Sequence, residues 1–105
     1  MTDLGFLGYI ALGDTLRLAL QCRNGSAVCT APDAAPSWAM YTDSDTSLLT
    51  GTLGATDADS KGGFRTGDAA ITSGNGFAVG DRVTVRFFYE ISTTDYAAVG
   101  FFQVV

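Results

Sequence analysis

The sequence predicts an all-β protein, an antiparallel β-sandwich of about seven strands. Three observations favour this fold class. Short segments alternate between apolar and polar residues, and turn-forming residues separate them, with 13 glycines against 2 prolines. No segment of ten or more residues shows a helical period between capping residues. The chain is 105 residues long and 47% hydrophobic, which suits a single domain over residues 1–105 with one core.

Each expected strand is an apolar or alternating segment between turn residues. The first segment is apolar and interrupted by glycines, so it forms one strand or a strand pair. The second places Leu16, Leu18 and Leu20 on one side and polar residues on the other. We expect a bulge at Gly67, because Phe64 and Ile71 have opposite parity although both are apolar. In chain order the expected strands cover residues 4–12, 15–23, 38–41, 48–53, 64–71, 82–90 and 96–104.

Composition excludes several function classes. The chain has no histidine, so Ser-His-Asp and Cys-His catalysis and His-ligated zinc sites are excluded. Glu90 is the only glutamate, and the aspartates lie mostly in turns, where nothing pairs two of them for acid–base chemistry. We therefore expect no enzyme activity, no catalytic residue, no cofactor and no metal.

Charge and hydropathy also limit the partners. The net charge is -5 and no basic run is present, so we expect no nucleic-acid partner. No apolar run approaches the length of a membrane span, and the first residues lack the features of a signal peptide. Proteins or neutral glycans remain as partners.

The two cysteines allow two interpretations. If the loop between them is the four residues "NGSA", antiparallel pairing places Cys22 directly opposite Cys29. Opposed residues lie about 4.5–5.5 Å apart at Cα, which a disulfide can span. The alternative is two free cysteines that act as small apolar side chains.

Two further patterns have a functional and a structural interpretation. "DADSKG", 57–62, resembles the first half of a calcium loop with Asp68 at its twelfth position, but Lys61 occupies a ligand position. We expect a solvated turn there, and "DSD" at 43–45 is a weaker pattern of the same kind. Four aromatic residues are candidates for a sugar-stacking platform, although the tryptophan among them is expected in the core. They are Trp38, Tyr41, Tyr89 and Tyr96.

The last two segments predict a hairpin with apolar side chains on both faces. Phe87 and Phe88 are adjacent, so they point to opposite sides of the sheet. A tight turn at Thr93 and Thr94 places Phe88 opposite Val99, Arg86 opposite Phe101 and Tyr89 opposite Ala98. The core face then holds Val83, Val85, Phe87, Tyr89, Phe102 and Val104. The outer face holds Phe88, Val99 and Phe101 beside Arg86.

Exposed clusters of this kind indicate a partner, because monomeric proteins seldom leave contiguous aromatic patches in water. Two alternatives remain. The residues 30–37 or the N-terminal strand of the same chain could cover the cluster. A one-residue change of register would redistribute its members between the two faces.

The later half of the chain resembles a known fold family. "GGFRTGDAAITSGNGFAVGDRVTVRFFYE" and "AAVGFFQVV" resemble the last three strands of immunoglobulin-like or macroglobulin-like sandwiches. "LGDTLRLALQCRNGSAV" and "APSWAMYTD" resemble earlier strands of those domains. The spacing of Cys22 and Trp38 fits antibody-type domains, but no cysteine follows Cys29. The inter-sheet disulfide is therefore absent, and an antigen-receptor role is excluded with it.

The short, acidic, histidine-free and Gly/Thr/Ala-rich chain also resembles small structural proteins of tailed-phage virions. That resemblance implies a self-assembling or capsid-bound role on the phage particle, without catalytic residues. We expect a capsid decoration (cement) protein that binds itself or the major capsid protein through Phe88, Val99, Phe101 and Arg86, as a homo-oligomer. Alternatives are a phage tail or neck component, an adhesion or glycan-binding module, and a calcium-stabilised surface domain.

Overall fold

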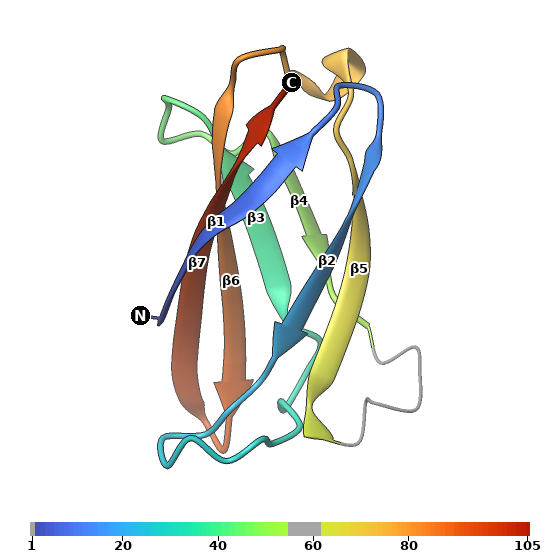
Figure 1. Ribbon diagram of the computed structural model, residues 1–105. Coiled ribbons are helices and arrows are strands. Elements are labelled where there is room, and N and C mark those ends of the chain that lie inside the picture. The colour runs from blue at the N-terminus through green and yellow to red at the C-terminus, as the bar shows by residue number, and fades with distance from the viewer. Residues whose placement is uncertain (1, 55–61) are drawn as a thin grey trace.

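The strands form two facing sheets in the computed structural model, which describes residues 2–54 and 62–105 (Figure 1). One sheet has five strands in the order β1-β7-β6-β3-β4, and the other pairs β2 with β5. The strands are β1 (Thr2–Ile10), β2 (Thr15–Gln21), β3 (Ser37–Tyr41), β4 (Leu49–Thr52), β5 (Phe64–Ala70), β6 (Arg82–Ile91) and β7 (Thr94–Val104). A 3-10 turn, η2 (Ser73–Asn75), lies between β5 and β6. The nearly all-β character expected from the sequence is confirmed.

The core lies between the two sheets. Strand β2 contributes Leu18 and Leu20 from one side, and β3 contributes Trp38 and Met40 from the other. The predicted core residues of the final hairpin are buried, except Tyr89, which is half-buried at the rim. They are Val83, Val85, Phe87, Phe102 and Val104. Burial of large apolar side chains on alternate positions explains why these segments form strands with one face inward.

The five-stranded sheet is mixed, which corrects the expectation of a purely antiparallel sandwich. Strand β1 runs parallel to β7 at the edge of the sheet. The two segments are far apart in the sequence, so no hairpin turn fixes their relative direction. The register of β1 shifts twice, and Gly5 and Gly8 adopt positive φ of 69° and 125° within it. Glycine is needed there because other residues rarely adopt such backbone angles.

The expected bulge at Gly67 is wrong. Pairing of β2 with β5 is unbroken along both strands. Gly67 is instead a site of close approach, because a Cβ atom there would lie 2.9 Å from the carbonyl oxygen of Thr52. Phe64 lies opposite Gln21 on the outward side and is only half-buried, whereas the buried Ile71 has the inward parity of Ala69, so no extra residue is required in the strand.

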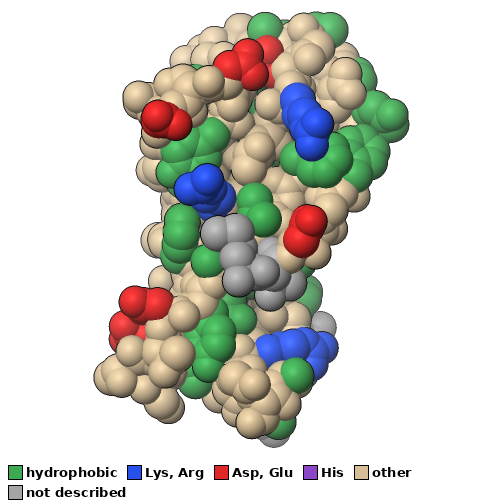
Figure 2. Space-filling model, turned by 90° about the vertical axis from the view of Figure 1, so that its left-hand side faces the viewer, with side chains coloured by type: hydrophobic (Ala, Val, Ile, Leu, Met, Phe, Trp, Pro, Cys, Tyr) green, Lys and Arg blue, Asp and Glu red, His purple; other side chains and the backbone are tan. Residues whose placement is uncertain are grey.

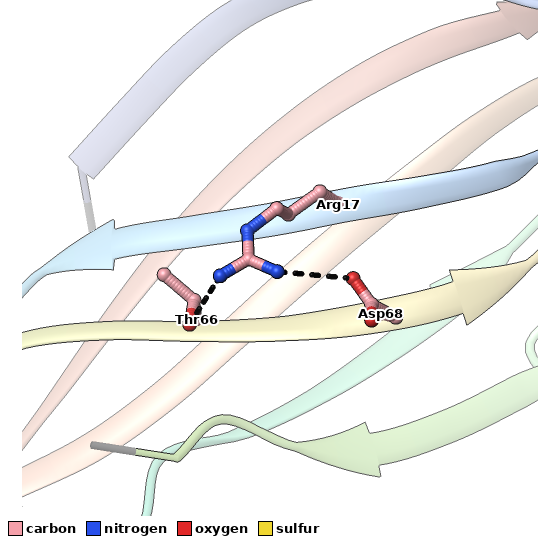
Figure 3. A network of polar contacts seen from close by, with 3 residues as sticks. All are labelled: Arg17, Thr66 and Asp68. Carbon is pink, nitrogen blue, oxygen red and sulfur yellow. Dashed lines mark hydrogen bonds and ion pairs between the residues drawn. The ribbon is translucent and has the colours of Figure 1, made fainter. Parts of the chain in front are cut away.

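The outward side of the two-stranded sheet is polar. Arg17 on β2 lies opposite Asp68 on β5, with Nη1 3.7 Å from Oδ1, and its Nη2 donates to Thr66 Oγ1 at 3.3 Å (Figure 3). Both members of the ion pair are largely exposed, so the pair adds little to stability. Its Asp68 is the residue that the calcium-loop pattern would have used as a ligand.

Both cysteines are free. Cys22 is buried, and Cys29 is exposed. Cys29 pairs with Arg23 rather than with Cys22, so the expected register was off by one residue. Burial raises the pKa of the Cys22 thiol, which is consistent with an unreactive apolar role.

The β6–β7 hairpin turns one residue earlier than expected. Ile91 pairs with Thr94, and the two loop residues Ser92 and Thr93 have φ of 50° and 65°. Positive φ at both central positions is typical of a type I′ turn, whose twist matches that of the flanking strands. Neither residue is the glycine or asparagine that such turns favour.

We expect Thr93→Gly to stabilise the protein by about 1 kcal/mol, because it removes the steric cost of a side chain in the left-handed region. Urea unfolding measures the change. Thr94→Gly is the matched control, because Thr94 lies in β7, where glycine should cost about 0.5–1 kcal/mol. Equal effects of the two substitutions would contradict a strained turn at Thr93.

Candidate protein-binding face

The outer face of the five-stranded sheet is the side turned away from β2 and β5. Strands β6 and β7 bring all four predicted binding residues onto it. Phe88 is 41% exposed, Arg86 is exposed, and Val99 and Phe101 are half-buried. Figure 2 views the side of the molecule where β6 and β7 run in Figure 1, and hydrophobic side chains there lie between basic and acidic ones.

The pairs across this hairpin differ from those expected. Arg86 lies opposite Val99, and Phe88 lies opposite Ala97. Moving the turn by one residue shifts the register by two, and a shift of two preserves which side each residue faces. The predicted face was therefore right although the predicted partners were wrong.

Two aromatic side chains on β1 enlarge the cluster. Phe6 is 47% exposed and Tyr9 is 66% exposed. The Phe6 ring lies 5.0 Å from the Tyr9 ring in an edge-to-face contact and 5.3 Å from the Phe101 ring. We call Tyr9, Phe6 and Phe101 the aromatic row. The N-terminal strand thus extends the apolar surface beside the hairpin, in addition to shielding one edge of Phe101.

Sequence reasoning missed Phe6 and Tyr9 as outer-face residues. The segment reads as one apolar run, and the glycine bulges break its alternation, so parity did not assign sides. Asp3 gave no usable signal, because its parity is opposite to that of Phe6 although the register shift puts both on the outer face. Asp3 occupies the same face, opposite Val99, and its carboxylate accepts from the Gly5 amide at 2.8 Å.

Two arginines lie over rings on the same face. The guanidinium carbon of Arg82 is 4.0 Å from the centroid of Phe101, and that of Arg86 is 5.4 Å from the centroid of Tyr41. Such contacts contribute about 0.5–1 kcal/mol at exposed sites. Neither arginine forms an ion pair with any residue in the described part of the chain. Their N–H groups are therefore available to a partner.

The turn end of the face is acidic. Glu90 lies opposite Asp95, and the Asp33 carboxylate accepts from the backbone amides of Ser92 and Thr93 at 3.0 and 3.1 Å. These donors hold the pKa of Asp33 below its ordinary value. Loss of hydration, together with hydrogen bonding and charge from Asp95 and Asp33, raises the pKa of Glu90. The turn end of the outer face is thus acidic, whereas the end toward the start of β6 carries both arginines and carboxylates.

The predicted sugar platform is not assembled. Trp38 is buried, and its Nε1 has no hydrogen-bond partner in the described residues. Tyr89 and Tyr96 stack on each other at 5.3 Å, and the Tyr89 hydroxyl donates to the Arg23 carbonyl at 3.1 Å. Tyr41 alone lines a polar surface. It borders a hollow of about 390 Å³ with Thr42, Asp43, Ser44, Asp45, Thr84 and Arg86.

The calcium-loop pattern falls mostly outside the description, since residues 55–61 are not described. Within residues 2–54 and 62–105, no three side chains of the metal-binding types gather closely enough to hold an ion. None of the described residues belongs to a helix long and apolar enough to cross a membrane.

Comparison with known proteins adds no assignment. No protein-family model matches the chain, and no curated protein matches it in sequence. The outer face itself is therefore the feature that bears on function.

We expect Asp33→Asn to lower the melting temperature at neutral pH, because the neutral amide accepts more weakly from the Ser92 and Thr93 amides. The lowered pKa sets the sign. An ionised Asp33 contributes stability above the ordinary pKa of 3.8, and this contribution is lost as the pH falls through the folded-state value. Melting curves from neutral pH to below the pKa of Asp33 should show the difference in melting temperature between variant and wild type becoming smaller as the pH falls. A gap that does not depend on pH would contradict this role.

Proposed function

We propose that this chain is a non-enzymatic structural protein that binds another protein through the outer face of its five-stranded sheet. The observation that carries the proposal is the aromatic row beside unpaired arginines. Three large apolar side chains on this face are more than 40% exposed, namely Phe6, Tyr9 and Phe88. Aromatic and arginine side chains dominate the binding energy of protein interfaces, and contiguous exposed patches of them mark such sites.

The chemistry of the face indicates the kind of partner. Arg82 and Arg86 are two cations of a chain with net charge -5. Both are held over rings, and neither forms an ion pair with a carboxylate in the described residues, although Asp43 and Asp45 line the same hollow as Arg86. A partner surface that is apolar at its centre and carries carboxylates at its rim is complementary to this arrangement.

The setting we propose is the particle of a tailed phage, where the chain decorates and cements the capsid. What supports it is the resemblance in composition to small virion proteins, together with a nearly all-β domain that offers one docking face. We also propose that the two sheets form an immunoglobulin-like sandwich. Seven strands in two sheets and a buried tryptophan on β3 support that assignment. A tail or neck position would use the same face.

We expect Phe6→Ser combined with Tyr9→Ser to weaken binding to capsid shells by about tenfold or more, because truncating central aromatic anchors costs about 2 kcal/mol or more. Co-sedimentation with shells of the phage that encodes the chain measures it. Val79→Ser is the matched control, because Val79 is 67% exposed and lies outside the sheets. Wild-type protein that binds neither shells nor tails of that phage would overturn the setting.

A glycan-binding module is the second candidate, and the hollow beside Tyr41 favours it. Its walls combine an aromatic ring with hydroxyl, carboxylate and guanidinium groups, the hydrogen-bonding groups that sugar hydroxyls need. We expect Tyr41→Ala to abolish any signal that the wild-type protein gives on a glycan array without unfolding the domain. A wild-type protein with no signal removes this candidate.

A further inference from the structure

The outward side chains at the turn end of β6 form an ordered triplet. Arg86, Phe88 and Glu90 are all exposed on the outer face, two residues apart from one another. Neighbours on one face of a strand lie about 7 Å apart. The order along the strand is therefore cation, aromatic ring, anion. We call these three residues the β6 triplet.

Neither charge of the triplet forms an ion pair within residues 2–54 and 62–105. Arg86 contacts only the Tyr41 ring among the interactions described for it. Glu90 has like charges around it, since Asp95 lies opposite and Asp33 is close enough to raise its pKa. Asp43 and Asp45 line the same hollow as Arg86 without forming an ion pair with it, so both ends of the triplet still offer a charge that an opposite charge can pair with.

A two-fold rotation brings the two ends together. Consider a two-fold axis midway between the outer faces of two copies. It runs parallel to the two sheets and perpendicular to β6, and it passes over Phe88. It sets β6 of one copy antiparallel across β6 of the other, so that Phe88 meets Phe88. Arg86 precedes Phe88 by two residues and Glu90 follows it by two, so Arg86 of each copy faces Glu90 of the other. The same patch serves both copies, as a closed two-fold contact requires.

The neighbours of Phe88 permit this approach. Ala97 on β7 and Ser37 on β3 lie directly opposite it, and Ala39 lies opposite Arg86. These small side chains leave the Phe88 ring standing above its surroundings. Two such surfaces can approach to about 10 Å, the usual spacing of packed sheets. The two Phe88 rings then lie side by side, each above the small side chains of the other copy.

We propose that the β6 triplet binds a second copy of this chain in an antiparallel, face-to-face dimer. The inference rests on the proposed docking role of the outer face and names the partner of its turn end. Arg82 lies six residues before Phe88, and the matching position in the second copy falls beyond the Ser92–Thr93 turn. Phe101 of the aromatic row lies opposite Thr84, whose matching position in the second copy is Ser92 in the turn, so the row lies at the edge of the contact or beyond it. The dimer therefore leaves that row free for a different partner.

Charge substitutions test this arrangement with the protein alone. Analytical ultracentrifugation of the whole chain, at concentrations up to about 1 mM, shows whether the mass is that of one 10.9 kDa chain or two. We expect Arg86→Glu and Glu90→Arg each to weaken the wild-type dimer by about tenfold or more, because each substitution opposes like charges twice. Asp14→Arg makes the same charge change as Glu90→Arg on an exposed residue away from the sheet face, and should leave the dimer unchanged.

Two combinations then separate the proposed geometry from general charge effects. An equimolar mixture of the Arg86→Glu and Glu90→Arg proteins should form a heterodimer, because both contacts regain opposite charges. The double variant Arg86→Glu/Glu90→Arg should dimerise by itself. Circular dichroism of each variant checks that it is folded, so loss of the dimer cannot be mistaken for unfolding.

Three outcomes would overturn the inference: a wild-type chain that stays monomeric over the whole range, a dimer indifferent to the single substitutions, or swaps that fail to restore association. None of these measurements uses a phage particle. Failure of the dimer is therefore distinct from failure of the virion role, which would appear as loss of shell binding by a protein of unchanged mass.

Discussion

The pairing of β6 with β7 is the constraint on which the rest of the structure depends. It runs without a shift from Arg82 opposite Gln103 to Ile91 opposite Thr94. This pairing sends Phe87 and Phe102 into the core and turns Phe88 and Phe101 outward. The two-residue turn sets the register, and Asp33 holds that turn through two backbone amides. Folding and the proposed docking therefore use opposite faces of one hairpin.

Much of this hairpin could be predicted because strand parity tolerates an error in the turn. Misplacing the turn by one residue changed every cross-strand partner but no residue's side. The assignment of Cys22 and Cys29 had no such tolerance. The expected register of this pair differs from the observed one by one residue. Cys29 lies opposite Arg23 instead of Cys22, and both thiols are free.

The sequence could not predict what depends on contacts between distant segments. The parallel pairing of β1 with β7 has no local signal, because no turn joins the two strands. Phe6 and Tyr9 belong to the outer face only through that pairing and through two glycine bulges. The function of Gly67 was missed for the same reason, since its requirement for a small residue comes from the backbone of Thr52.

The outer face divides into two halves of different chemistry, and this division follows from the direction of the strands. Cation–ring contacts and the aromatic row lie toward the start of β6, whereas carboxylates collect at its turn. A partner with one uniform charge cannot satisfy both halves, because the acidic turn would repel what the arginines attract. A surface whose positive and negative charges follow each other in the reverse order can pair with Arg86 and Glu90 at the turn end. An antiparallel copy of β6 is such a surface. The aromatic row, with Arg82, then remains for a partner that is apolar and acidic.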